Sequence, residues 1–336
     1  MNGTEQALTR RSHSAPRGGM RRRTPSLLLN MRAIALNSYG TADELIEVDL
    51  PDPKVAPGEV LIRVRAAGVN PVDWKLASGG LDPVMEAHFP LIPGWDVAGV
   101  VEATGFDVPE YQVGDEVYGY VRKDWAQNGT YAELVSASVR MVAHKPRSLD
   151  WKEAAGVPLA ALTALQSIDR VAPVSGETAL VNAAAGGVGS FAVQIARARG
   201  VRVIGTASER NHDYLHALGA EPVTYGEGLA ERVRALAPEG VDAVFDFVGE
   251  GAVEASLPVA KKTRRIVSIA DPSVTDHGGH YLWVRPDHGD LAELARLADE
   301  GKLSVHVERT FPLVEAADAW RLSQEGHTRG KIVLTV

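Results

Sequence analysis

A glycine-rich turn between an apolar run and an amphipathic run restricts this chain to a small set of folds. Residues 183–189 read AAAGGVG, and residues 178–181 (TALV) before them have the character of a buried strand. After the turn, residues 191–200 repeat apolar side chains at helical spacing and end at a glycine. A strand, a tight glycine turn and a helix begin a dinucleotide-binding unit, where the helix N-terminus offers free N–H groups to a pyrophosphate. A turn that only packs a helix against a strand would have a similar sequence. Other residues must therefore show whether this turn binds a dinucleotide.

The next predicted strand, residues 201–207 (VRVIGTA), indicates which nicotinamide cofactor fits. In enzymes that prefer NAD, this strand ends about 20 residues past the turn in an Asp or Glu that binds the ribose 2′-hydroxyl. Here that position is Ala207, followed by Ser208 and Arg210. A carboxylate would repel a 2′-phosphate, whereas a hydroxyl and a guanidinium would bind it, so the segment favours NADPH. The alternative is that Arg210 only solvates the start of the next helix, where Glu209 is an ordinary first-turn acid.

Composition excludes several classes of function. A length of 336 residues suggests two domains, and no apolar run approaches the roughly 18 residues of a membrane span. The formal net charge of −8 argues against nucleic acid as the main partner. The chain contains no cysteine, so disulfides and zinc sites that need thiolate ligands are excluded.

The first thirty residues differ from the rest of the chain. They contain six arginines, two prolines and a single acid, Glu5, with no periodic apolar face, and we predict that they are disordered. The composition also resembles that of a transit peptide, whereas the apolar stretch 27–29 is too short for a secretory signal. Met20 and Met31 offer later starts, and we interpret residues 1–30 as a dispensable extension before a fold that begins at Met31.

The pattern of predicted secondary structure changes near residue 148. From residue 31 to about 146, short apolar runs are separated by proline and glycine, as in a small β-rich barrel. From there on, strand and helix patterns alternate, which favours a parallel doubly wound sheet. We therefore predict an α/β fold with a first domain over 31–150 and a nucleotide-binding domain over 151–303.

The individual elements follow from periodicity. The predicted strands are 59–66, 97–101, 116–118, 178–181, 201–207, 241–248 and 266–269. The predicted helices are 151–172, 191–200, 210–218, 229–236 and 290–299, and the tail 305–336 has the pattern of strand, helix and strand.

The order of motifs resembles a known family. The matching segments are 68–73 (GVNPVD), 93–99 (PGWDVAG), 113–117 (VGDEV), 129–133 (GTYAE), the glycine turn and 329–333 (RGKIV). Together they are similar to the zinc-free quinone oxidoreductase and enone (alkenal) reductase branch of the medium-chain dehydrogenase/reductase superfamily. The resemblance covers nearly all of residues 31–336. It implies a GroES-like barrel domain that residues 304–336 complete, a Rossmann domain, and a cleft between them.

The resemblance also bears on metal chemistry. Zinc-dependent relatives place Cys and His ligands where this chain has Asn70 and Trp95, neither of which serves as a zinc ligand here. We therefore expect no metal, and chemistry that needs no Lewis acid: transfer of a hydride to a carbon that conjugation already activates.

Lys75 and Asn70 are the predicted catalytic residues. Related enone reductases carry a lysine at the place of Lys75, where an ammonium would stabilise a forming enolate or hydroquinone oxygen. Asn70 would hydrogen-bond cofactor or substrate. The alternatives are a solvated or ribose-contacting Lys75 and a turn role for Asn70 before Pro71. Asp73 is expected to fix the local loop.

The remaining site predictions concern the cofactor and the substrate. A flat, apolar substrate is expected against aromatic walls, although the same side chains are as readily explained as core: Trp74, Trp95, Tyr118 and Trp125. The predicted cofactor-binding residues are Ala185, Gly186, Gly187, Val188, Gly189, Ser208, Arg210, Tyr225, Thr163 and Lys331. For Thr163, a place inside a helix is an equally good interpretation.

The sequence and the resemblance together predict a cytoplasmic, NADPH-dependent reductase of quinones or of α,β-unsaturated ketones and aldehydes. The family also implies a homodimer, formed near residues 281–284 (YLWV), and the net charge and the lack of a long apolar run predict neither nucleic acid nor a membrane as partner. An enoyl-thioester reductase of the fatty-acid or polyketide type and an NADPH-binding protein with little turnover are the alternatives.

Overall fold

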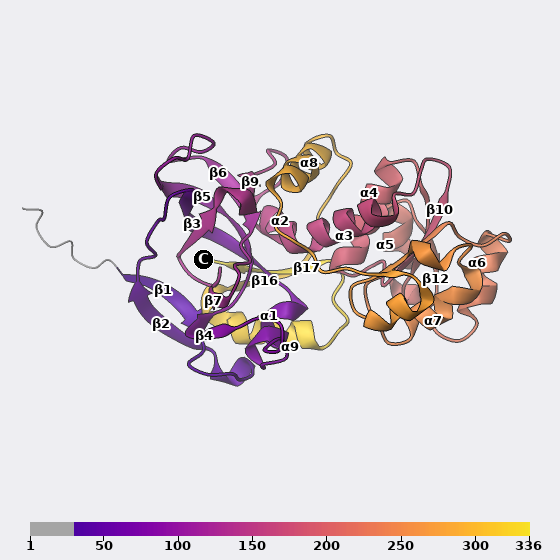
Figure 1. The fold of residues 1–336 in the computed structure, drawn as a ribbon, viewed down its shortest axis with the longest axis horizontal. Coiled ribbons are helices and arrows are strands. Elements are labelled where there is room, and N and C mark those ends of the chain that lie inside the picture. The colour runs from indigo at the N-terminus through magenta and orange to yellow at the C-terminus, as the bar shows by residue number, and fades with distance from the viewer. Residues whose placement is uncertain (1–29) are drawn as a thin grey trace, which may run out of the picture.

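The computed structural model describes residues 30–336 as two domains side by side, one rich in strands and one of alternating strands and helices (Figure 1). The predicted α/β class is confirmed. The prediction for residues 1–30 lies, apart from Asn30 at the start of the first strand, outside the described residues.

The second domain is built on a six-stranded parallel sheet with strand order β12-β11-β10-β13-β14-β15. Its strands are β10 (Thr178–Asn182), β11 (Arg202–Thr206), β12 (Glu221–Val223), β13 (Ala243–Asp246), β14 (Ile266–Ser268) and β15 (His280–Tyr281). The order reverses between β10 and β13, and in open parallel sheets ligands bind outside the carboxyl ends of the strands at such a point.

Helices accompany this sheet. They are α3 (Pro158–Val171), α4 (Gly187–Ala198), α5 (His212–Ala217), α6 (Leu229–Leu236), α7 (Ala252–Ser256) and α8 (His288–Asp299). The short helix before them, α2 (Trp151–Gly156), packs against the sheet of the first domain instead. The apolar face of α4 is buried at Phe191 and Ile195, which explains the helical spacing in the sequence.

The first domain centres on an antiparallel system around the long strand β3 (Glu59–Val69), which pairs with both β5 (Asp96–Thr104) and β8 (Leu134–Ser138). Around them lie β1 (Asn30–Ala35), β2 (Ile46–Pro51), β4 (Ala87–Ile92), β6 (Glu116–Tyr120), β7 (Ala126–Asn128) and β9 (Val142–His144). One helix, α1 (Pro71–Ala77), follows β3 directly.

The C-terminal tail returns to this first domain. It forms β16 (Val307–Pro312), α9 (Ala316–Gln324) and β17 (Lys331–Thr335), and β17 inserts between β16 and β3. In Figure 1 the yellow end of the chain therefore lies among indigo and magenta strands. Trp320 of α9 is completely buried in the core beneath them.

The predicted helix over 151–172 is wrong at its middle, because the chain forms two helices there. Pro158 has no N–H to donate and its ring would meet the carbonyl of the preceding turn, so α2 ends at Gly156 and α3 begins anew at Pro158. The new helix start leaves the backbone N–H of Leu159 free for a partner outside the helix.

Candidate functional site

The glycine turn connects β10 to α4, and its glycines Gly186 and Gly189 are needed for different reasons. The turn is held to the end of β11, since the backbone N–H of Ala184 donates to the Thr206 carbonyl at 2.9 Å. A Cβ on Gly189 would stand 2.2 Å from the Ala183 carbonyl oxygen, so packing requires that glycine. A Cβ on Gly186 would meet nothing nearer than 3.4 Å. Gly186 therefore leaves open space at the start of α4 where a phosphate would approach.

A cleft of about 390 Å³ opens at the carboxyl ends of β10, β11 and β13. Its walls are the turn, the end of β11 with the residues after it, the loop after β13, and residues 326–328 of the returning tail. Five of the predicted cofactor-binding residues line it: Ala185, Gly186, Ser208, Arg210 and Tyr225. The other three residues of the turn, Gly187, Val188 and Gly189, form the first turn of α4 behind this wall.

The end of β11 has no carboxylate facing the cleft. Ala207 is nearly buried, Ser208 and Arg210 line the opening, and the Tyr225 ring beside them is 60% exposed. The Arg210 guanidinium donates to the His327 carbonyl at 3.1 Å, which holds it against the returning tail. This end of the cleft thus combines a cation, a hydroxyl and a phenol, a set that suits a phosphate.

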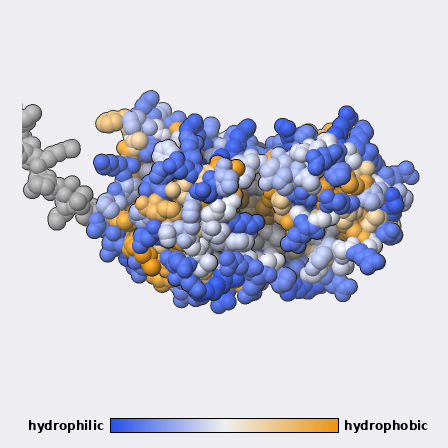
Figure 2. Space-filling view, turned by 60° about the horizontal axis from the view of Figure 1, so that its bottom comes forward, coloured by the Kyte–Doolittle hydropathy of each residue, from blue (hydrophilic) through white to orange (hydrophobic). Residues whose placement is uncertain are grey.

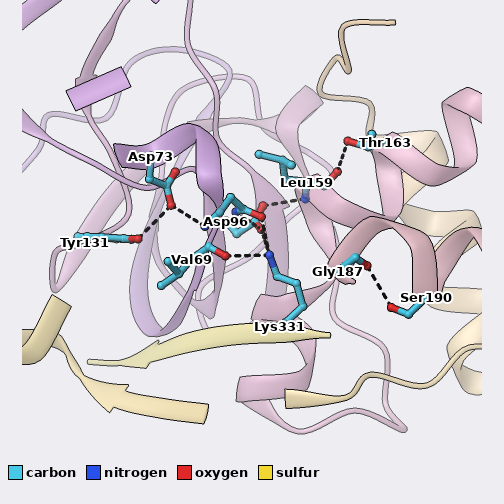
Figure 3. Close-up of polar contacts among 10 residues, drawn as sticks. Val69, Asp73, Asp96, Tyr131, Leu159, Thr163, Gly187, Ser190 and Lys331 are labelled. Atoms are coloured by element: carbon cyan, nitrogen blue, oxygen red, sulfur yellow. Dashed lines mark hydrogen bonds and ion pairs between the residues drawn. The ribbon is translucent and has the colours of Figure 1, made fainter. Parts of the chain in front are cut away.

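Asn70 lies in a buried polar network rather than in an open cleft. Its side-chain amide donates to Asp96 Oδ2 at 2.9 Å, and its carbonyl oxygen accepts from Lys331 Nζ. Lys331 Nζ also donates to the Val69 carbonyl at 3.0 Å and lies 4.0 Å from Asp96 Oδ2 (Figure 3). Asp96 Oδ1 accepts from the free backbone N–H of Leu159 at 2.7 Å. The network therefore joins the end of β3, the start of β5, the start of α3 and the start of β17.

Asp73 extends this network into the first domain. Its Oδ2 accepts from the backbone N–H of Asn70 at 2.8 Å and from the Tyr131 hydroxyl at 3.0 Å, and Trp320 Nε1 donates to that hydroxyl at 3.2 Å. The expected loop-fixing role of Asp73 agrees with these contacts. Asp73 Oδ1 is buried with no hydrogen-bond partner.

Burial shifts the ionisation of all three charged groups in the network. It raises the pKa of Asp73 to about 7, with the neighbouring Asp96 acting in the same direction. It raises the pKa of Asp96 to about 6, against the attraction of the Lys331 ammonium. Burial also lowers the pKa of Lys331, opposed by the two carboxylates. One ammonium thus faces two carboxyl groups, of which Asp73 holds its proton more firmly.

Lys75 lies exposed on α1, five residues after Asn70, with its ammonium 5.5 Å from the centre of the Trp74 ring. The Trp74 indole is half-buried and donates to Ser323 Oγ of α9 at 3.2 Å. Lys75 and Trp74 are therefore presented together by a short helix whose start is held in the buried network.

None of the four predicted pocket walls, Trp74, Trp95, Tyr118 and Trp125, lines the 390 Å³ cleft. Tyr118 is completely buried and its hydroxyl donates to the Leu291 carbonyl of α8, so it is a contact between the domains with no face free for a substrate. Trp95 is 6% exposed and packs edge-on against Tyr120. Trp125 is half-exposed, and its ring forms a T-shaped pair with His88.

Two predicted cofactor residues are occupied by contacts within the protein. Thr163 is buried inside α3 and its hydroxyl donates to the Leu159 carbonyl at 2.7 Å, in agreement with the helix-interior interpretation. Lys331 directs its ammonium into the network, and only its aliphatic chain approaches the glycine turn. Neither side chain lines the cleft.

Sequence reasoning missed two walls of the cleft. One is the loop 248–251 after β13, in which Gly249, Glu250 and Gly251 all have positive φ angles. The glycine spacing at the end of a strand beside β10 is a signal that could have identified it. The other is the tail segment 326–328, whose position depends on the return of β17 and has no local signal.

Within residues 30–336, no group of three His, Asp or Glu side chains lies close enough to share a metal ion. No helix in the same range has the length and apolar character needed to cross a bilayer.

Comparisons with known families agree with the two-domain structure. Residues 56–147 match the family described as an alcohol dehydrogenase GroES-like domain, and residues 218–334 match one described as a zinc-binding dehydrogenase.

Comparisons with individual proteins cover most of the chain. It is 34% identical to the mouse (Mus musculus) mitochondrial NAD(P)H oxidoreductase RTN4IP1, over 83% of this chain and 82% of that protein. It is 32% identical to the chloroplastic NADPH-dependent alkenal/one oxidoreductase of Arabidopsis thaliana, over 92% and 80% of the two chains. Among solved structures, the quinone oxidoreductase from Coxiella burnetii matches with a TM-score of 0.81 and 34% identity, over 92% of this chain and all of that one.

Proposed function

Because this chain belongs to the quinone and enone reductase branch of the medium-chain dehydrogenase/reductase superfamily, we propose that it is an NADPH-dependent, zinc-independent reductase. Its acceptors are quinones or the C=C bond of α,β-unsaturated ketones and aldehydes. The proposal includes a homodimer that forms through residues 281–284.

The observation that carries the choice of cofactor is the polar end of the cleft. Ser208, Arg210 and Tyr225 surround the place where the adenosine ribose of a dinucleotide would lie, and Ala207 stands where a carboxylate would select NADH. A charge-assisted hydrogen bond from Arg210 to a 2′-phosphate contributes roughly 1.5–3 kcal/mol. That difference corresponds to a preference of about tenfold or more for NADPH.

The residues of the turn fit a dinucleotide. Gly186 leaves the space that a Cβ would fill, and the start of α4 directs its free N–H groups and its partial positive charge toward it. When bound there, NADPH would supply the hydride, a reaction for which protein side chains have no equivalent. In this proposal the turn and Arg210 would hold the cofactor, and Lys75 of α1 would lie beside the acceptor.

Lys75 would stabilise the negative charge that develops on the acceptor oxygen when the hydride reaches the β-carbon or the quinone ring. Beside it, the Trp74 ring offers an apolar surface for a conjugated acceptor. The one proton that completes the reduction, at the α-carbon of an enone or on the hydroquinone oxygen, would come from water or a weak acid. In Figure 2 the surface is hollowed where the two domains meet, which gives such an acceptor a way in.

The decisive experiment is NADPH oxidation with a short-chain enone and with a benzoquinone, repeated with NADH. We expect turnover with at least one acceptor and a clear preference for NADPH. In Arg210→Ala the KM for NADPH should rise about tenfold while that for NADH changes little. Arg199→Ala, which removes an arginine paired with Asp169 outside the cleft, is the matched control.

Other outcomes separate the alternatives. Activity with NADH equal to that with NADPH, unchanged in Arg210→Ala, would contradict the choice of cofactor. Tight NADPH binding without oxidation by either acceptor would contradict the choice of substrate. An enoyl thioester added to the same assay then distinguishes a thioester reductase from a binding protein.

A further inference from the structure

We infer that Lys331 is a positioning residue that connects α1 to the glycine turn. It thereby holds constant the distance between α1, on the acceptor side of the site, and the turn, on the cofactor side. The inference rests on the proposed function for its kinetic part. It concerns a side chain that contacts neither the cleft nor solvent: Lys331 is 4% exposed and does not line the cleft.

The ammonium end of Lys331 holds the start of α1. Its Nζ donates to the carbonyl of Val69, the last residue of β3, and to the side chain of Asn70, the residue before α1. No more than five residues separate these contacts from Lys75. Loss of the ammonium would leave the Val69 carbonyl and the Asn70 amide oxygen without the donor that satisfies them.

The aliphatic part of Lys331 lies against the glycine turn. A Cβ on Gly187, the first residue of α4, would stand 3.1 Å from Lys331 Cδ. Gly330, the residue before Lys331, donates its backbone N–H to the Ala185 carbonyl at 3.0 Å. A single residue of the returning tail therefore contacts both α1 and the turn (Figure 3).

The charge of Lys331 is balanced within the same network. Asp96 is completely buried, lies 4.0 Å from Lys331 Nζ, and accepts from Leu159 at the start of α3. Without the ammonium, Asp96 would be a buried carboxylate with hydrogen bonds but no opposite charge, which is unfavourable. A cationic side chain supplies the opposite charge at this position, whereas a neutral side chain of the same length does not.

These contacts predict that loss of the Lys331 ammonium lowers kcat but leaves NADPH affinity almost unchanged. The turn keeps its own backbone bonds to β11 and to Gly330 when the ammonium is removed, so NADPH binding should remain close to normal. The start of α1 loses one of its anchors while the contacts of Asn70 to Asp96 and Asp73 remain, and displacement of a catalytic group by about 1 Å lowers turnover by as much as a hundredfold. A replacement that only weakened the fold would not separate kcat from NADPH affinity in this way.

The test compares Lys331→Met with Lys331→Arg and with Lys145→Met. Lys145 is a matched control because it is also buried and also donates to two backbone carbonyls, those of Pro146 and Leu149, but contacts neither α1 nor the turn. Each variant is assayed for kcat, for NADPH affinity by fluorescence titration, and for hydrogen exchange of the amides of residues 72–79 without cofactor.

In Lys331→Met we expect kcat to fall roughly ten- to hundredfold with NADPH affinity changed less than about threefold. Exchange over residues 72–79 should be faster than in the wild type, and Lys331→Arg should restore both properties in large part. Lys145→Met should change neither kcat nor exchange in α1, even if it melts at a lower temperature.

The outcomes keep this inference separate from the proposed function. Unchanged exchange over residues 72–79 in Lys331→Met overturns the inference whether or not the wild type is active. Faster exchange with unchanged kcat shows a structural anchor and overturns the positioning role. A wild type that does not oxidise NADPH overturns the proposed function, while the exchange data still decide whether Lys331 holds α1.

Discussion

Asp73 shows how a single buried carboxyl group can make the fold sensitive to pH. Tyr131, Asp96 and Lys331 are the titratable side chains that face it, and burial raises its pKa to about 7. A carboxyl group whose pKa is higher in the folded state than in the unfolded state favours folding at low pH. That contribution is complete below the unfolded pKa and is lost as the pH rises through the folded pKa.

We therefore expect Asp73→Asn to remove part of the pH dependence of stability. Between pH 6 and pH 8, the wild type should lose roughly 1 kcal/mol of stability through this group, whereas the variant has no proton to lose there. Urea unfolding at pH 6, 7 and 8 measures the difference. Parallel stability curves for the two proteins would contradict the assignment of the raised pKa to Asp73.

Lys75, unlike Asp73, is exposed, and its proposed role is to stabilise the negative charge that develops on the acceptor. We expect Lys75→Ala to lower kcat about tenfold for the better acceptor, because the developing oxyanion loses a nearby cation, and to leave NADPH affinity unchanged. Steady-state kinetics and a fluorescence titration measure the two effects. Lys152→Ala, an exposed lysine on α2, is the control, and equal kinetics in both variants would exclude Lys75 from the reaction.

At the scale of elements, the glycine turn contains two glycines that are needed for different reasons. Gly189→Ala would force its Cβ to within 2.2 Å of the Ala183 carbonyl, so it should destabilise the protein strongly. Gly186→Ala meets no protein atom closer than 3.4 Å and should keep the melting temperature of the wild type. Its added methyl group would stand in the space left for the phosphates, so NADPH affinity should fall at least about tenfold.

Thermal melts followed by NADPH titration check this pair of variants. Two results would contradict the assignment of Gly186 to the cofactor: normal NADPH affinity in Gly186→Ala, or a loss of stability equal to that in Gly189→Ala. Either would mean that the turn serves helix packing alone.

Local patterns were sufficient to predict most elements of the second domain. The strand and helix around the glycine turn, β13, α6 and α8 lie where apolar periodicity places them. The break at Pro158 was missed because the apolar pattern continues through it. The resemblance to the family was needed to expect the return of the tail to the first domain.

The buried network could not be predicted from periodicity. Lys331 and Asn70 are 261 residues apart in the chain, and only the pairing of β17 with β3 brings them together. The same pairing brings Gly330 to the turn, whereas the side chain of its neighbour Lys331, which was expected to bind the cofactor, is directed into the network. For Tyr118 the difficulty was similar: its contact with α8 depends on how the two domains pack.

At the scale of the whole molecule, the outer edge of β15 is the end of the six-stranded sheet among the described residues. Beside it Tyr281 and Trp283 are 41% and 45% exposed, although large aromatic side chains are seldom left in water on an open edge. We expect Trp283→Arg to convert the proposed homodimer into a monomer in sedimentation analysis. Val113→Arg, at an exposed position of the first domain, should leave the assembly unchanged. A wild type that sediments as a monomer would contradict the proposal.

The return of the tail has a consequence for folding of the chain during translation. The sheet of the first domain has no strand beside residues 66–69 of β3 until β17 has been synthesised. All strands of the second domain leave the ribosome earlier. The domain that is encoded first is therefore completed after the second, and until then residues 66–69 of β3 offer an unpaired edge to chaperones.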